Sequence, residues 1–204
     1  MRRMLAVPML FLLLLSACGV DQSTAQTPVR FRTQLNETQS CRYELSLRGD
    51  YGDYVRDFCL DCTYTPQEAD FTVVEPEEAA GIAAKVSGDG AKVSYNSTIL
   101  AVEQFESRRL SPMAAPWLLG QAWQRGYIAS VGTDGEIETV AYTLKYGGST
   151  LSITTGFLQG LPVQSEISDG ENVLISCEIK DFSLGKKEAD QNEDVKTNLG
   201  GDQS

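Results

Sequence analysis

Cysteine is the residue type in this chain with the most chemistry available to it, and histidine is absent. The 204 residues include five cysteines and no histidine. Without an imidazole, Ser-His-Asp and Cys-His sites and histidine-bearing zinc sites are excluded. Gly-x-Ser-x-Gly, P-loop and Gly-x-Gly-x-x-Gly motifs are missing too. We therefore expect a protein that is not an enzyme, with no catalytic residues, no cofactor and no metal site.

The first cysteine, Cys18, ends a short targeting segment. Arg2 and Arg3 precede an apolar run over residues 5–14, which is too short to cross ~30 Å of hydrocarbon, and Leu15-Ser16-Ala17-Cys18 follows. These four residues resemble the bacterial lipobox, in which Cys18 receives a diacylglyceryl group and the chain is cut just before it. A plain secretory signal is the alternative. With palmitate-type chains on Cys18, two or more acyl chains would hold the protein stably on the extracytoplasmic face of the cell membrane.

The other four cysteines predict two disulfides, because their number is even and the chain is exported. Pairing Leu47 with Tyr54 across a hairpin would place Cys41 diagonal to Cys62 on one face. We therefore favour Cys41–Cys62 and Cys59–Cys177 among three connectivities. Cys59-x-x-Cys62 lies in a strand-like stretch, so a thioredoxin-type redox site is disfavoured.

The strongly negative net charge argues against nucleic-acid binding as a function. The formal net charge of −11 becomes −13 once the segment carrying Arg2 and Arg3 is removed. Such an acidic body repels nucleic acid and anionic headgroups. The carboxylates of Glu75, Glu77 and Glu78 lack calcium-loop spacing and are expected to be surface groups.

The elements that must position these residues are mostly strands. Apolar residues alternate with polar ones along a series of short stretches separated by Asp-Gly, Gly-Gly and similar turns, which predicts antiparallel hairpins. A first strand is expected over 29–35. Further strands are expected near 43–47, 58–64, 71–75, 84–86, 93–95, 99–103, 128–131, 137–146, 151–157, 163–167 and 173–182.

One apolar helix interrupts this series. Pro112 and Pro116 mark helix starts, and both tryptophans lie in the stretch that follows, which ends near Gly126. We interpret this helix either as ordinary core or as a lid over an apolar cavity. The second interpretation makes Trp117, Leu118, Leu119 and Trp123 the ligand-cavity candidates.

Together these patterns predict a mainly β, α+β fold. A curled antiparallel sheet, or half-barrel, would have the short apolar helix packed in or over its concave face. The domain organisation is a signal peptide at 1–17, a lipidated N-terminus and linker at 18–28, a β-rich domain at 29–184 and a disordered polar tail at 185–204.

Two resemblances follow from these motifs. The run Glu75-Pro76-Glu77-Glu78-Ala79-Ala80-Gly81-Ile82, the Asp89-Gly90 turn and the closing Ile179-Lys180-Asp181-Phe182 resemble small lipoproteins of clostridia-type bacteria. Strand order and the helix insertion resemble, more distantly, the LolA/LolB superfamily of lipoprotein carriers and its mycobacterial relatives. That resemblance implies a half-barrel in the cell envelope that holds acyl chains.

Three functions remain open. The first is a membrane-anchored half-barrel that binds a lipid, acyl chain or lipoprotein. The second is a non-catalytic module that meets another envelope protein through its convex face or edge strands, as in a sensor. The third and least favoured is a histidine-free hydrolase based on carboxylates.

Overall fold

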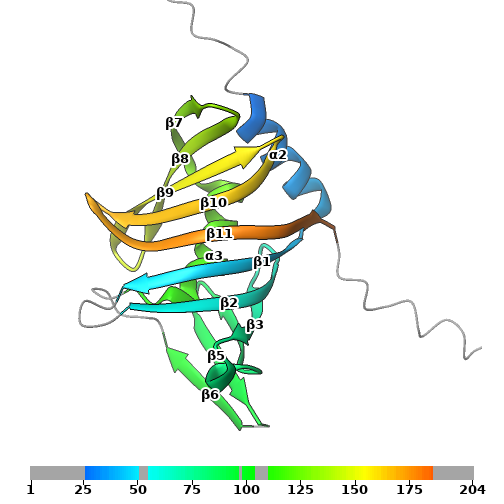
Figure 1. The fold of residues 1–204 in the computed structure, drawn as a ribbon, viewed down its shortest axis with the longest axis vertical. Coiled ribbons are helices and arrows are strands. Elements are labelled where there is room, and N and C mark those ends of the chain that lie inside the picture. The colour runs from blue at the N-terminus through cyan, green and yellow to red at the C-terminus, as the bar shows by residue number, and fades with distance from the viewer. Residues whose placement is uncertain (1–25, 51–54, 97, 104–109, 186–204) are drawn as a thin grey trace, which may run out of the picture.

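A single antiparallel sheet of 11 strands dominates the computed structural model, which describes residues 26–50, 55–96, 98–103 and 110–185 (Figure 1). The strand order is β6-β5-β4-β3-β2-β1-β11-β10-β9-β8-β7. The strands are β1 (Cys41–Asp50), β2 (Val55–Tyr64), β3 (Ala69–Glu75), β4 (Ala83–Ser87), β5 (Gly90–Tyr95), β6 (Thr98–Glu103), β7 (Tyr127–Asp134), β8 (Ile137–Tyr146), β9 (Ser149–Leu158), β10 (Leu161–Asp169) and β11 (Asn172–Leu184).

Two meanders make up the sheet, and the first and last strands join them. Strands β1 to β6 and β7 to β11 each follow one another by hairpins, while β1 pairs with β11 through partners such as Leu47 and Cys177. Alternate residues of the central strands are buried on one face, as in β1, where Tyr43, Leu45 and Leu47 are buried. The predicted fold class, a curled antiparallel sheet with a short apolar helix, is confirmed.

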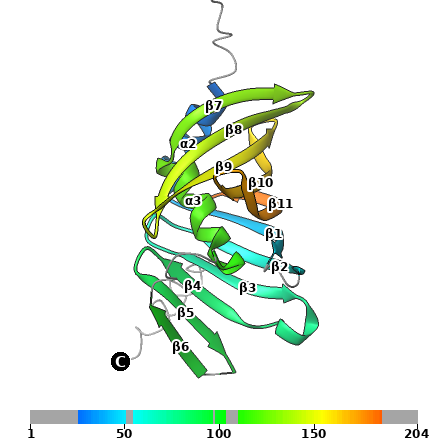
Figure 2. The same cartoon turned by 90° about the vertical axis from the view of Figure 1, so that its left-hand side faces the viewer.

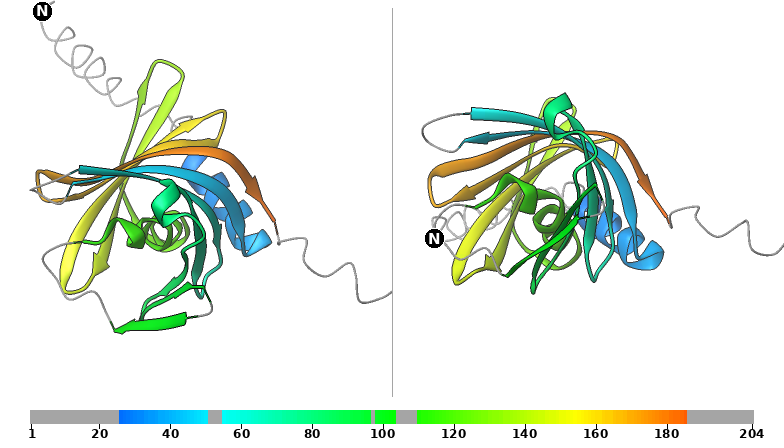
Figure 3. Two further views of the ribbon diagram at one scale, coloured as in Figure 1. Left: turned by 60° about the horizontal axis from the view of Figure 1, so that its bottom comes forward. Right: turned by 90° about the horizontal axis from the view of Figure 1, so that it is seen from below.

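Helix α3 (Ala115–Arg125) lies in the curve of the sheet (Figures 2 and 3) and follows the short turn η3 (Pro112–Ala114). Residues 115–123 are all buried, because the apolar inner faces of both meanders surround the helix. Gly120 lets the helix approach the sheet closely: a Cβ there would lie 2.1 Å from Cδ2 of Tyr64. The concave face is therefore filled by α3.

A second helix replaces the predicted first strand. Residues Gln26–Thr38 form α2, so the strand expected over 29–35 is wrong. Pro28, Phe31 and Leu35 are the buried residues of α2, a spacing that fits one face of a helix. Alternation of apolar and polar residues over so short a stretch also fits a strand. The helix is favoured by tertiary packing, because Phe31 makes edge contacts with Trp123 and Phe157.

Helix α2 also fixes the end of α3. Arg32 donates hydrogen bonds to the carbonyl oxygens of Trp123 (2.9 Å), Gly126 (2.6 Å) and Ala122 (3.4 Å). The carbonyls of Trp123 and Gly126 lie at the C-terminal end of α3, where they lack intrahelical partners and carry partial negative charge, while that of Ala122 also accepts the N–H of Gly126 (2.9 Å). Because α2 begins at Gln26, the last residues of the predicted linker belong to the folded body.

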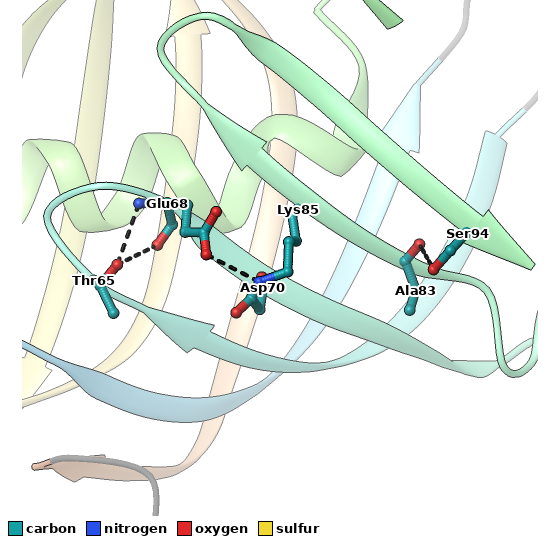
Figure 4. Close-up of polar contacts among 6 residues, drawn as sticks. All are labelled: Thr65, Glu68, Asp70, Ala83, Lys85 and Ser94. Atoms are coloured by element: carbon teal, nitrogen blue, oxygen red, sulfur yellow. Dashed lines mark hydrogen bonds and ion pairs between the residues drawn. The ribbon is translucent and has the colours of Figure 1, made fainter. Parts of the chain in front are cut away.

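The arm formed by β3, β4 and β5 carries β6 to the far end of the molecule from α2 (Figure 1). The 3-10 turn η2 (Glu77–Ala79) links β3 to β4. Figure 4 shows the polar contacts of this arm: Lys85 forms ion pairs of 2.9 Å with Glu68 and Asp70, and Ser94 donates to the carbonyl of Ala83 (3.4 Å). These contacts join three neighbouring segments of the arm.

Candidate functional site

The four predicted cavity residues all lie on α3 and are all buried. Leu118, Leu119 and Trp123 have no exposed surface, and Trp117 is 4% exposed. Trp123 packs against Tyr43 and Phe182 and donates a hydrogen bond from Nε1 to Oγ1 of Thr155 (3.0 Å). Of the four, Trp117 alone lines one of the hollows described below. All four side chains therefore belong to one helix, as predicted, but three of them lie in the core and line none of these hollows.

Trp117 borders a hollow of about 270 Å³ between the two meanders. The turn joining β4 and β5 forms one wall, the end of β8 and its turn into β9 form the other, and α3 forms the floor. The lining residues are Gly88, Trp117, Gln121, Arg125, Leu144, Lys145, Tyr146 and Gly147. We call this the inner hollow.

The inner hollow is amphipathic. Trp117, Leu144 and Tyr146 supply apolar surface, while Arg125 and Lys145 bring two cations to a strongly acidic protein. Such a combination suits a ligand with an apolar part and an anionic group. At about 270 Å³, the space is just below the usual range for small-molecule pockets, so it would hold one end of a longer ligand.

A hydrogen-bonded chain behind the inner hollow fixes its polar floor. Gln121 donates from Nε2 to the hydroxyl of Tyr64 (2.8 Å), and that hydroxyl donates to Oε1 of Gln124 (2.8 Å). Burial raises the pKa of Tyr64, so its hydroxyl stays neutral. The buried amide of Gln121 is thereby satisfied, and this wall of the hollow is held in place.

A larger groove of about 920 Å³ crosses the outer face of the sheet, opposite α3. It runs from the end of β3 over β2, β1, β11, β10 and β9 to β8. Its lining is polar and acidic, and the charged members are Arg48, Asp57, Glu75, Glu166 and Glu178. We call it the outer groove. It lies on the convex face, which the second function left open as a contact surface, but the sequence did not indicate which residues line it.

The four cysteines of the body are free thiols in the structure, so neither predicted disulfide is present. The observed hairpin pairs Leu47 with Phe58 and Cys41 with Tyr64, not Leu47 with Tyr54. The shift is an even number of residues, so Cys41 and Cys62 still share the buried face and remain diagonal neighbours.

The second predicted pairing is incompatible with this fold. Cys59 lies opposite Ser46 on the outer face, whereas Cys177 lies opposite Leu47 on the buried face. Strand β1 separates β2 from β11. A disulfide requires Cα atoms within about 7 Å and side chains that point toward each other. Cys59 and Cys177 therefore cannot bond without rearranging the sheet.

The lipidation residue, Cys18, lies outside the described residues, as do the predicted signal peptide and most of the tail. Within the described residues, no helix is both long and apolar enough to cross a membrane. The same residues hold no cluster of three or more His, Cys, Asp or Glu side chains suited to a metal ion.

No protein-family model matches the sequence, and no curated protein matches it. Solved structures do match, at low identity. A DUF1329 family protein from Desulfovibrio piger is 12% identical with a TM-score of 0.48, over 79% of this chain and 92% of that one. A LolA superfamily protein from Nitrosomonas europaea is 8% identical with a TM-score of 0.45, over 80% and 94%.

The lipoprotein LppX from Mycobacterium tuberculosis is 11% identical with a TM-score of 0.38, over 82% of this chain and 98% of that one. The neighbours thus include a LolA superfamily protein and a bacterial lipoprotein. With TM-scores below 0.5, these likenesses assign no function to this chain.

Of the residues that line the inner hollow, Trp117 was predicted from the sequence and the others were not. Arg125 and Lys145 are ordinary charged residues in the sequence, and only the curl of the sheet brings Lys145 beside α3. The one local signal was Gly147-Gly148, which marks the turn between β8 and β9.

Proposed function

We propose that this chain is an extracytoplasmic lipoprotein, tethered to the cell membrane through a diacylglyceryl group on Cys18, that binds an acyl-chain ligand. It would belong to the group of clostridia-type lipoproteins that its motifs resemble. The supporting observation is the inner hollow, where apolar and cationic side chains meet beside Trp117. One end of the ligand chain would lie against Trp117 and Tyr146, with its anionic group toward Lys145 and Arg125.

Because α3 fills the concave face, the proposed ligand is only partly enclosed. Leu118, Leu119 and Trp123 would support the site as core and would not touch the ligand. This differs from a lid over a wide apolar cavity, which was one interpretation of the same residues. Binding would be non-catalytic, since it needs only apolar contact and charge pairing.

Quenching by a brominated fatty acid tests this site, because the two tryptophans report on different places. Bromine quenches indole fluorescence on contact. We expect saturable quenching in the wild-type body and in Trp123→Phe, and its loss in Trp117→Phe. Equal quenching of both single-tryptophan variants, or none in the wild type, would contradict the proposal.

A charge-reversal variant tests the orientation of the ligand. Lys145→Glu should weaken binding of the fatty acid by about tenfold, since one ion pair is replaced by a repulsion. Lys92→Glu, at an outer-face position of β5, is the matched control and should bind as the wild type does. A fatty alcohol should lose little affinity on Lys145→Glu, because it has no carboxylate.

Binding of an envelope protein is the second candidate, and the outer groove favours it. This groove has more than three times the volume of the inner hollow and is lined with carboxylates. We would replace Glu166 by a photo-crosslinking residue in the native host. A specific protein adduct would support this role, and adducts no different from those at an exposed control position would contradict it.

A further inference from the structure

Strand β6 forms one of the two edges of the sheet. Its side chains are mostly apolar, and its pairing with β5 is regular. It pairs with β5 along its whole length, from Thr98 opposite Tyr95 to Glu103 opposite Gly90, with no register shift. The strand reads Thr-Ile-Leu-Ala-Val-Glu and contains no proline and one charge, at its end. Six-residue segments of this kind readily pair with further strands.

Side chains on this edge are exposed on both faces of the sheet. Ile99 is 70% exposed, Leu100 is 63% exposed, and Tyr95 on the neighbouring strand is 47% exposed. Consecutive residues of a strand point to opposite faces, so Ile99 and Leu100 present apolar surface on each side of β6. An added strand would cover both.

The other edge strand of the sheet, β7, is less regular than β6. Strand β7 has an irregular register between Ile128 and Ser130 and contains Gly132, while its one charge, Asp134, lies at its end as Glu103 does in β6. Bulges and charges are the usual means by which natural sheets prevent strand addition at an edge. Strand β6 has no such device before Glu103.

Charge favours a second copy of this chain as the occupant. The whole chain is strongly acidic, but residues 90–103 contain one lysine, Lys92, and one glutamate, Glu103, so the hairpin is neutral. Two acidic copies can therefore approach here with the least repulsion. In an antiparallel pair with its twofold axis between Leu100 and Ala101, Ile99 faces Val102 and Thr98 faces Glu103, so no like charges oppose each other.

We propose that two copies of this chain associate by antiparallel pairing of their β6 strands, which joins their sheets. The contact is isologous, so it closes as a dimer. The ion pairs of Lys85 with Glu68 and Asp70 connect β4 to the start of β3, in the arm that carries β6 (Figure 4). The β6 edge lies at the far end of the molecule from α2 (Figure 1). This inference does not depend on lipid binding.

Sedimentation equilibrium of residues 18–204 carrying Cys18→Ala, over a range of concentrations, tests the pairing. We expect a reversible monomer–dimer equilibrium. Leu100→Lys and Ile99→Lys should each raise the dimer dissociation constant by about tenfold or more, because each removes two symmetry-related apolar cross-strand pairs. Both positions are exposed, so either variant should fold, and circular dichroism checks that it does.

Tyr127→Lys on β7 is the matched control, since Tyr127 is 74% exposed on the other edge, and it should dimerise like the wild type. A protein that is monomeric at every concentration would overturn the proposal. So would a dimer unaffected by both β6 variants, a dimer lost in Tyr127→Lys, or assembly that continues beyond the dimer. A monomer whose β6 cross-links to a different envelope protein would overturn self-pairing in favour of that partner.

Discussion

At the scale of single residues, the cysteines give the clearest expectations. Burial raises the pKa of all four thiols of the body, but Cys41, Cys62 and Cys177 are buried, whereas Cys59 lies partly exposed on the outer face. Because the thiolate is the reactive form, the three buried thiols should resist modification. Ellman's reagent should therefore titrate one thiol in the folded Cys18→Ala body and four after denaturation. Two or fewer after denaturation would show that disulfides form in the exported protein.

Stability should fall as the pH rises above the pKa of an unfolded thiol. Burial raises the pKa of Cys177 to about 12, against about 8.5 in an unfolded chain. The folded protein keeps this thiol protonated, so its stabilising contribution is complete below about pH 8.5 and is lost as the pH rises toward the folded pKa.

Urea unfolding between about pH 8 and pH 10 measures this loss. One group with a raised pKa contributes a slope of up to about 1.4 kcal/mol per pH unit. Cys177→Ala should show a shallower decline than the wild type. An identical slope in the two proteins would mean that Cys177 does not titrate in the way its burial implies.

At the scale of elements, Gly120 controls how closely α3 approaches β2. Gly120→Ala would place a methyl group 2.1 Å from the Tyr64 ring, so the helix or the ring must move. We expect a loss of about 1–3 kcal/mol in the free energy of unfolding, as for other overpacked cores. Gly132→Ala is the control, since a Cβ at Gly132 meets no atom within 4 Å. Equal stability of the two variants would contradict this close approach.

Arg32 of α2 should stabilise the C-terminal end of α3. Arg32→Ala leaves the carbonyls of Trp123 and Gly126 without their side-chain donor. The expected loss is roughly 1–3 kcal/mol by thermal or urea unfolding. Arg30→Ala, an exposed position of α2, should change stability little. If both substitutions cost the same, the cap is not what connects α2 to α3.

Local patterns predicted most of the strands but not α2. Turn residues such as Asp134-Gly135 and Gly147-Gly148 set the hairpins of β7 to β9, because glycine readily adopts the positive φ found there. Over 29–35 the alternation of Val29, Phe31, Thr33 and Leu35 favoured a strand. Helix α2 forms there instead, because Phe31 packs against Trp123. This contact joins residues 92 positions apart, so it cannot be predicted from local periodicity.

At the scale of the whole molecule, the pairing of β1 with β11 decides where the candidate sites lie. It joins the two meanders, and the curl of the joined sheet sets Gly88 and Gly147 on either side of α3. The apolar helix and Trp117 could be predicted from local sequence patterns, but the inner hollow and the outer groove depend on this long-range pairing of β1 with β11. The same strand pairing keeps Cys59 apart from Cys177, since strand β1 lies between β2 and β11.

The proposed anchor is likewise a property of the whole chain. With Cys18→Ala, the protein should move from the membrane fraction to the soluble fraction of the native host, because the acyl chains supply its membrane affinity. Fractionation followed by immunoblotting measures this directly. A Cys18→Ala protein that still sediments with membranes would place the anchor elsewhere in the chain.

Native mass spectrometry of the body purified from a bacterial envelope tests the central claim, acyl-chain binding at the inner hollow. We expect an adduct that extracts as an acyl lipid in the wild-type body, is lost in Trp117→Ala and is retained in the outer-groove variant Glu166→Ala. A clean apo mass that stays unchanged after incubation with lipids would contradict acyl-chain binding. An adduct that persists in Trp117→Ala would contradict the proposed site.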